Sequence, residues 1–195
     1  MSNKKIAITG GIGSGKSTVC KILKALGFSV YSCDEIYKEI IESPEYIQQI
    51  QGIFPQVVIE NHIDRQKLAQ LVFSNERYRK ELNAVAHPLI MKTLLEYMKN
   101  TDNPLVFAEV PLLFEEKLEH YFDEIWVVLR DFNARVESAM NRDQCDREAV
   151  LNRIRAQYDY EDKNALTYFH NINAVIIENN KDENALKEQL KALIV

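Results

Sequence analysis

A glycine-rich stretch near the start of the chain has the residue types and the spacing needed to bind phosphate. Gly10 is followed, after four residues, by Gly15, Lys16 and Ser17, which fits the pattern G-x-x-x-x-G-K-[ST]. Glycines let backbone N–H groups turn around phosphate oxygens, the lysine ammonium reaches the β- and γ-phosphates, and the serine hydroxyl ligates Mg²⁺. The pattern therefore predicts that ATP, or another nucleoside triphosphate, binds residues 10–18 together with Mg²⁺.

Two carboxylates follow predicted strands, at the edge where open α/β sheets bind ligands. Glu109 ends the apolar run 104–109, so it can hold a water of the Mg²⁺ shell, or it simply ends a strand. Asp34 follows the run 28–32 and can face the phosphate loop, where it would accept the proton of an attacking hydroxyl. A plain helix cap explains the same aspartate, so both interpretations stay open.

The segment 131–162 holds arginines but no lysine. Guanidinium groups bind phosphate oxygens bidentately and stabilise charge that is spread over several oxygens. For the group as a whole we expect a lid that brings at least one arginine over the phosphates, although ordinary solvated ion pairs explain any single one. The arginines are Arg135, Arg142, Arg147, Arg153 and Arg155.

Strand and helix patterns alternate along the chain and would position these groups. A strand, a glycine loop, a helix and a second strand form a βαβ unit, which predicts a parallel sheet within a three-layer α/β fold. Residues 34–100 are mostly helical in pattern, and they are too many for a loop, so they predict a helical insertion. Strands are expected at 5–9, 28–32, 104–109, 124–129 and 173–178, with a further possible strand at 57–60.

Composition limits the function classes. The chain has 195 residues and a formal net charge of −5, which does not favour general capture of nucleic acid or of an anionic membrane. No apolar run approaches the ~20 residues that cross a bilayer. Cys20, Cys33 and Cys145 are far apart, which suits a reducing compartment, and we expect a cytoplasmic protein.

Two weaker features concern the ends of elements. Asn179 and Asn180 follow the last predicted strand, so either one can lie near a nucleotide base. His87 precedes Pro88 at a predicted helix start, although an isolated histidine is most often structural.

Taken together, six stretches in this order make the chain resemble the dephospho-coenzyme A kinase family. They cover nearly the whole chain, and the His-Pro pair together with PLLFE is specific to few families. The stretches are ITGGIGSGKST (8–18), CDEIYKEI (33–40), AHPLI (86–90), EVPLLFE (109–115), NRDQCDREAVLNRIRAQ (141–157) and VIIENN (175–180).

The resemblance implies an enzyme that transfers a phosphoryl group from ATP to the ribose 3′-hydroxyl of dephospho-CoA, with Mg²⁺. It implies a P-loop NTPase core with a five-stranded parallel sheet (1–33, 101–134 and 172–195), a helical CoA domain (34–100) and a helical lid (135–171). Its implied catalytic residues are Asp34, Lys16 and Arg142. ATP would be held by Gly11, Ile12, Gly13, Ser14, Gly15, Lys16, Ser17, Thr18, Arg142 and Asn179. The acceptor would contact Asp34, His87, Pro111, Leu112 and Leu113, and the metal Ser17 and, through water, Glu109.

The chain departs from the family pattern at several positions. Ser32 stands where a first aspartate is usual, and Glu109 where an aspartate is usual. A glutamine and an arginine three residues apart are replaced by Arg135 and Ser138. The alternatives are a kinase of another small hydroxyl compound or nucleoside monophosphate, and a slow nucleotide-dependent switch. We expect a monomer or a weak homo-oligomer.

Overall fold

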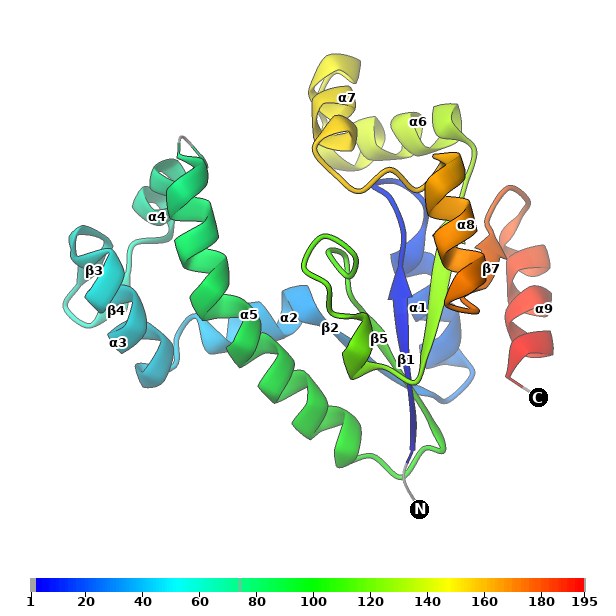
Figure 1. Ribbon diagram of the computed structural model, residues 1–195, viewed down its shortest axis with the longest axis horizontal. Helices are drawn as coiled ribbons and strands as arrows, with labels where there is room; N and C mark the ends of the chain where they lie inside the picture. The colour runs from blue at the N-terminus through cyan, green and yellow to red at the C-terminus, as the bar shows by residue number, and fades with distance from the viewer. Residues whose placement is uncertain (1–2, 74, 195) are drawn as a thin grey trace. The chain divides into compact units, whose positions relative to one another are not determined.

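The computed structural model describes residues 3–73 and 75–194. It divides into two compact units, one of residues 1–30 and 98–195 and one of residues 31–97 (Figure 1). The first unit carries the sheet and the second is mainly helical.

A five-stranded sheet organises the first unit, and the predicted α/β fold class is confirmed. The strand order is β2-β5-β1-β6-β7, and β5, β1, β6 and β7 pair in parallel. The last strand begins two residues later than predicted because Asn173 has a left-handed φ of 52° and belongs to the preceding turn. The strands are β1 (Lys4–Thr9), β2 (Ser29–Ser32), β5 (Leu105–Glu109), β6 (Glu124–Leu129) and β7 (Val175–Glu178).

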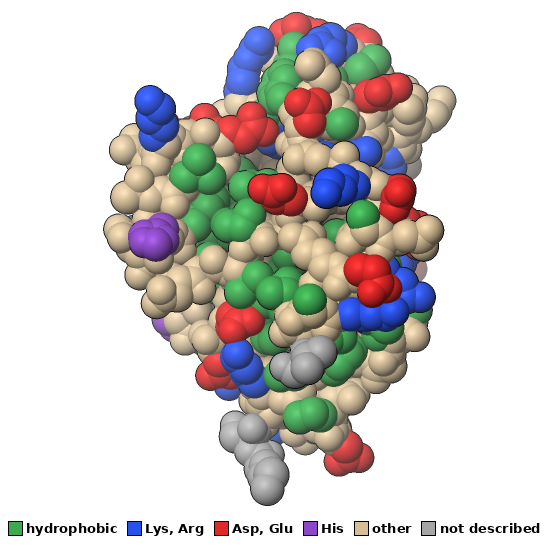
Figure 2. Space-filling model, turned by 90° about the vertical axis from the view of Figure 1, so that its right-hand side faces the viewer, with side chains coloured by type: hydrophobic (Ala, Val, Ile, Leu, Met, Phe, Trp, Pro, Cys, Tyr) green, Lys and Arg blue, Asp and Glu red, His purple; other side chains and the backbone are tan. Residues whose placement is uncertain are grey.

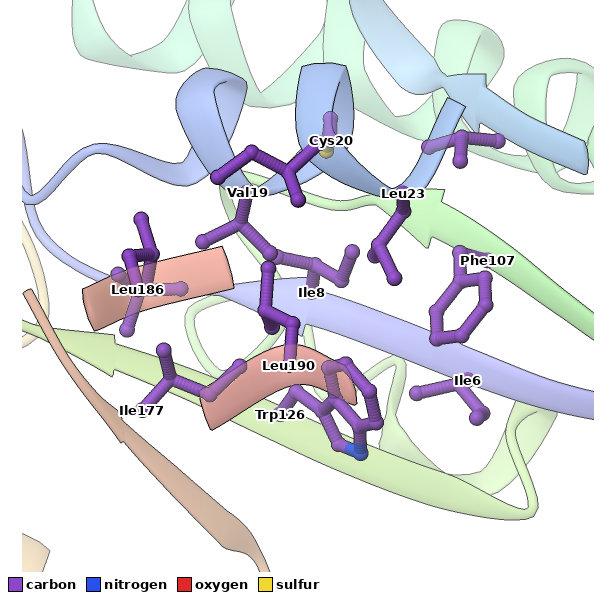
Figure 3. Packing of buried hydrophobic residues seen from close by; sticks show 13 residues of the cluster. Ile6, Ile8, Val19, Cys20, Leu23, Phe107, Trp126, Ile177, Leu186 and Leu190 are labelled. Carbon is purple, nitrogen blue, oxygen red and sulfur yellow. The ribbon is translucent and has the colours of Figure 1, made fainter. Parts of the chain in front are cut away.

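Alternation along the strands divides the core of this unit between the two faces of the sheet. Ile6 and Ile8 point to the face covered by α1 (Lys16–Ala25) and α9 (Glu183–Leu193), where they pack with Trp126 (Figure 3). A strand residue two positions along returns to the same face, so these apolar side chains form one continuous layer.

The opposite face of the sheet is covered by aromatic rings. The Thr9 hydroxyl lies 3.0 Å from the hydroxyl of Tyr160, which is buried. Phe114 packs on Phe169 of α8 (Lys163–Asn171), with ring centroids 5.1 Å apart. The three layers are therefore α1 and α9 on one face, the sheet in the middle, and α8 with the aromatic side chains on the other face.

Two short helices follow β6 and pack near the glycine loop. They are α6 (Phe132–Asp143) and α7 (Arg147–Arg155), and Val136, Ala139 and Val150 form a small buried cluster between them. Ile12 of the loop packs against this cluster. Residues 135–171 thus belong to the same compact unit as the sheet, and their assignment to a lid stays a prediction. The short helix η2 (Glu119–Tyr121) precedes β6.

The second unit consists of helices and one small hairpin. Glu60 and Asn61 both have positive φ, 48° and 63°, which produces the tight turn between β3 and β4. The possible strand at 57–60 is therefore real but only two residues long. The elements are α2 (Cys33–Ile40), α3 (Pro44–Ile53), η1 (Pro55–Val57), β3 (Val58–Ile59), β4 (His62–Ile63), α4 (Arg65–Phe73) and α5 (Glu76–Lys99).

Two expectations about helix ends were wrong. Pro88 lies inside α5 and does not start a helix. It removes one backbone donor, but Ala86, Ile90 and Met91 on both sides are buried, and their packing keeps the helix continuous. Asp34 is not a cap either, because Ser32 is the N-cap of α2 and Asp34 already lies in the first helical turn.

The buried phenol of Tyr160 predicts a loss of stability at alkaline pH. Burial raises the pKa of Tyr160, so above about pH 10 the unfolded chain loses this proton before the folded chain does. The folded state then binds more protons, and the free energy of unfolding must fall as pH rises. In urea titrations between pH 8 and pH 10.5, we expect Tyr160→Phe to decline less steeply than the wild type. Equal slopes for the two proteins would contradict this.

Candidate phosphate-binding site

The glycine loop leads from β1 directly into α1, and the helix begins without a side-chain cap. Gly15 is the N-cap residue, and it has no side chain that could cap the first amides of the helix. Uncapped amides and the positive end of the helix dipole together suit a bound anion. The loop therefore lies between a strand and a helix, as the sequence pattern predicted, and its binding of phosphate stays a prediction.

Two of the loop glycines are required by close contact with the protein itself. Gly13 and Gly15 have left-handed φ values of 75° and 96°. A Cβ on Gly13 would lie 2.2 Å from the Arg135 carbonyl oxygen, and one on Gly15 would lie 2.1 Å from Nδ2 of Asn179. Any side chain here would push the loop away from its support, a reason that the sequence pattern did not reveal.

Lys16 folds over the loop. Its Nζ donates to the carbonyl oxygens of Gly10 at 2.6 Å and Gly11 at 3.1 Å. Burial is the main cause that lowers the pKa of Lys16 to about 8; within that shift Glu109 acts in the opposite direction, and the charges of Arg135 and Arg142 add to the lowering. An ammonium so poorly solvated gains strongly from an anion placed beside it.

Ser17 and Glu109 form a pair of oxygen ligands beside the loop. The Ser17 hydroxyl donates to Glu109 Oε1 at 3.0 Å, which joins the start of α1 to the end of β5. Cys20 also lies here: burial raises the pKa of its thiol, and Glu109 beside it adds to the shift. Hydroxyl and carboxylate oxygens suit Mg²⁺. Within residues 3–73 and 75–194, no three His, Cys, Asp or Glu side chains cluster as a metal site.

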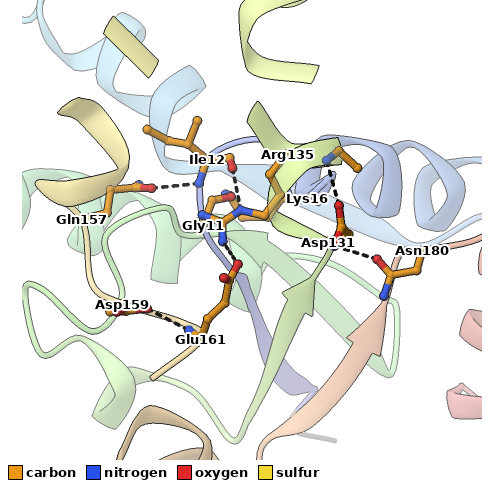
Figure 4. A network of polar contacts seen from close by, with 10 residues as sticks. Gly11, Ile12, Lys16, Asp131, Arg135, Gln157, Asp159, Glu161 and Asn180 are labelled. Atoms are coloured by element: carbon orange, nitrogen blue, oxygen red, sulfur yellow. Dashed lines mark hydrogen bonds and ion pairs between the residues drawn. The ribbon is translucent and has the colours of Figure 1, made fainter. Parts of the chain in front are cut away.

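Side chains from distant parts of the chain hold the outer side of the loop (Figure 4). Gln157 Oε1 accepts from the Ile12 amide at 2.8 Å, and Arg135 Nε donates to the Ile12 carbonyl at 3.0 Å. Asn179 Nδ2 donates to the Ser14 carbonyl at 2.8 Å. The Asn180 side chain bonds Asp131 in place of the loop: its Oδ1 accepts from the Asp131 amide at 2.7 Å.

Arg142 is exposed and is held by its neighbour. Its Nε and one terminal nitrogen donate to the two oxygens of Asp143 at 2.7 and 2.9 Å. Arg153 donates to the same carboxylate at 2.5 Å, and these bonds hold the pKa of Asp143 far below its usual range. The carboxylate thus joins α6 to α7 and orients the guanidinium of Arg142.

The predicted acceptor residues divide between the two units. In the sheet unit, Pro111 is half-buried, Leu112 is exposed and Leu113 is fully buried, so Leu113 packs in the core. In the helical unit, Asp34 lines a cavity of about 490 Å³, and His87 lies in α5.

Comparison with known proteins gives consistent matches over nearly the full length. The family model for dephospho-CoA kinase matches residues 4–184. A dephospho-CoA kinase from Thermus thermophilus is 36% identical over 189 residues, 97% of this chain and 89% of the relative. One from Fusobacterium nucleatum is 36% identical over 184 residues, 93% of this chain and 92% of the relative.

Solved structures agree. The crystal structure of TT1252 from Thermus thermophilus has a TM-score of 0.83 and 34% identity, and the match covers 100% of this chain and 97% of that one. Dephospho-CoA kinase from Campylobacter jejuni has a TM-score of 0.65 and 25% identity, over 98% and 96% of the two chains.

Proposed function

The chain belongs to the dephospho-CoA kinase family, and we propose that it transfers the γ-phosphoryl group of ATP to the ribose 3′-hydroxyl of dephospho-CoA, the last step of coenzyme A biosynthesis. It is a kinase and so a transferase. The observation that carries the proposal is the start of α1: Gly15 gives it no side-chain cap, Lys16 bonds the loop carbonyls, and Ser17 donates to Glu109. No specific observation favours the alternative, a kinase that phosphorylates another small hydroxyl compound or a nucleoside monophosphate.

The residues of the sheet unit would bind ATP and stabilise charge. The amides of the loop bind phosphate oxygens, and Lys16 leaves the Gly10 and Gly11 carbonyls to bridge the β- and γ-phosphates. Ser17 would ligate Mg²⁺, with Glu109 holding one of its waters, and the ion supplies charge neutralisation when bound. Arg142 moves from Asp143 to the transferring oxygens, which fits its exposed position.

The helical unit would bind the acceptor, and Asp34 would take the proton from its hydroxyl. Asp34 is exposed and lines a cavity whose other walls include Tyr37, Leu68 and Val72. Lys38 and Arg65 line the same cavity and supply positive charge suited to an acceptor that carries phosphate. An exposed carboxylate at the edge of such a cavity can act as a general base.

The test is acceptor-dependent release of ADP. Dephospho-CoA, adenosine, AMP and shikimate are each supplied with ATP and Mg²⁺, and ADP and product are measured together. We expect one ADP for each CoA formed, with dephospho-CoA preferred. Stimulation by AMP but not by dephospho-CoA would refute the assignment, and so would steady ADP release that no acceptor changes.

Substitution of Glu109 tests the metal ligands. Glu109→Gln keeps the shape of the side chain but removes the charge that orients a metal-bound water. We expect the Mg²⁺ concentration for half-maximal rate to rise by about 10- to 100-fold, measured as initial rates over a Mg²⁺ titration. Glu109→Asp should lie near the wild type, because the charge is kept. An unchanged Mg²⁺ dependence in the glutamine variant would exclude Glu109 from the metal site.

The surroundings of the site fit a reaction in the cytoplasm. Acidic and basic side chains are interspersed on the face shown in Figure 2, and the formal net charge of the chain is −5, so we infer that local groups bind the anionic substrates. No disulfide joins Cys20, Cys33 or Cys145 in the described part of the chain, which suits a reducing compartment. None of the helices in residues 3–73 and 75–194 combines the length and apolar character needed to cross a membrane.

A further inference from the structure

Three successive carbonyl groups of the glycine loop each accept a hydrogen bond from a different side chain. Arg135 Nε donates to the Ile12 carbonyl at 3.0 Å, Arg130 to the Gly13 carbonyl at 3.4 Å, and Asn179 Nδ2 to the Ser14 carbonyl at 2.8 Å. The donors follow β6 or β7 or lie in α6, more than a hundred residues along the chain. The loop is therefore held from outside along its whole apex.

Holding a carbonyl also fixes the direction of the next amide. The peptide unit is planar and trans, so the C=O of one residue and the N–H of the next point in opposite directions. Carbonyls of Ile12 and Ser14 that point out to the protein aim the amides of Gly13 and Gly15 the other way. The Ser14 amide closes a turn onto the Gly11 carbonyl at 3.2 Å, so the effect falls on the two glycine amides.

Arg135 makes the most demanding of these contacts. Its side chain is almost completely buried, and its guanidinium also forms an ion pair with Glu161. It lies directly on Gly11, where an added Cβ would come within 2.3 Å of a terminal nitrogen (Figure 4). Two nitrogens of the fork thus have fixed partners, Ile12 and Glu161, and the third lies against Gly11, an arrangement that a lysine cannot reproduce.

We propose that Arg135 and Asn179 are positioning residues: they hold the loop carbonyls so that the Gly13 and Gly15 amides are aimed at the phosphates before the nucleotide arrives. The proposal rests on the proposed ATP site. It differs from a direct contact between Arg135 and phosphate, because the guanidinium already serves Ile12 and Glu161. It also differs from a contact between Asn179 and the base, because the Asn179 amide faces the loop.

The test compares binding of ATP and of inorganic triphosphate, which has no base, by calorimetry. We expect Arg135→Lys and Arg135→Met to weaken both ligands by about tenfold or more, since each loses hydrogen bonds made by a charged group. We expect Asn179→Ala to weaken the binding of ATP and of triphosphate equally. Arg77→Met, which removes an exposed arginine of α5, is the control for loss of charge alone.

Each result decides between two roles. Wild-type affinity in Arg135→Lys would show that charge alone matters and would overturn the positioning role. Loss of ATP binding but not of triphosphate binding in Asn179→Ala would assign Asn179 to the base. Glu161→Gln alters an exposed partner, so it can be read even if the Arg135 variants fail to fold. It should weaken both ligands, and wild-type affinity would count against the proposal.

The kinase assay separates this inference from the proposed function. If the wild type binds triphosphate and Arg135→Lys does not, the inference stands even when dephospho-CoA is not phosphorylated. If the wild type makes CoA but both Arg135 variants bind ATP as it does, only the inference fails.

Discussion

Asp34→Asn is expected to lower kcat for phosphorylation of dephospho-CoA by about 10²- to 10⁴-fold, the range for loss of a general base. Asparagine keeps the size of the side chain and the polar lining of the cavity, but it cannot accept the proton of the attacking hydroxyl. The KM for ATP should stay near the wild-type value, because the predicted nucleotide contacts come from other residues. Steady-state rates with each substrate varied in turn measure both quantities.

A charge in the first turn of a helix also stabilises that helix, and this effect must be separated from catalysis. Asp34 and Glu45 both lie in the first turn of a helix of the second unit, α2 and α3. Glu45→Gln therefore removes the same kind of helix interaction away from the cavity and should leave kcat near the wild-type value. If Asp34→Asn bound ATP normally and turned over at the wild-type rate, Asp34 would not be the base.

The fold was predictable where the sequence pattern is local. Runs such as Ile6 to Thr9 are buried on both faces of a parallel sheet, so nearly every residue is apolar and the strand is plain in the sequence. The prediction at Pro88 was wrong because packing between distant residues overrode the local pattern. A proline is a local signal for a helix start, but α5 continues through it because buried neighbours such as Met91 and Leu94 pack the helix on both sides.

The distinction between local and distant contacts also explains which residues of the site could be predicted. Lys16, Ser17 and the loop amides lie within one short stretch, so spacing alone could identify them. Gln157, by contrast, meets Ile12 from 145 residues away, and no spacing rule connects them. Arg130 offered one usable signal, since it directly follows a predicted strand and so comes to the ligand-binding edge of the sheet.

Family resemblance gave roles to positions but could not show their contacts. Asn179 is the clearest case: its place after the last strand predicts a contact with the nucleotide, and the structure shows that its Nδ2 donates to the Ser14 carbonyl. A position near a ligand can act on the ligand or on the loop that binds it. The hydrogen-bond partner of the side chain points to one role, and the comparison of ATP with triphosphate binding tests it.

Lys16→Met is expected to lower kcat/KM for ATP by about 10²- to 10³-fold, as for the loss of one preorganised group that stabilises transition-state charge. The ammonium is poorly solvated in the loop, which lowers its pKa to about 8, so the protein holds this charge at a cost to stability. Removing it relieves that cost but leaves the Gly10 and Gly11 carbonyls without their donor. These two effects oppose each other, so the thermal midpoint should stay close to that of the wild type while activity is lost.

Lys21→Met is the matched control, because Lys21 is an exposed lysine of the same helix. It should leave both the kinetics and the midpoint unchanged. Lys16→Arg keeps the charge, but a planar fork cannot fold onto the two loop carbonyls as the ammonium does, so most of the activity should still be lost. If Lys16→Met kept the wild-type kcat/KM, or if its lost activity followed a large drop in the midpoint, the charge of Lys16 would not be what binds the phosphates.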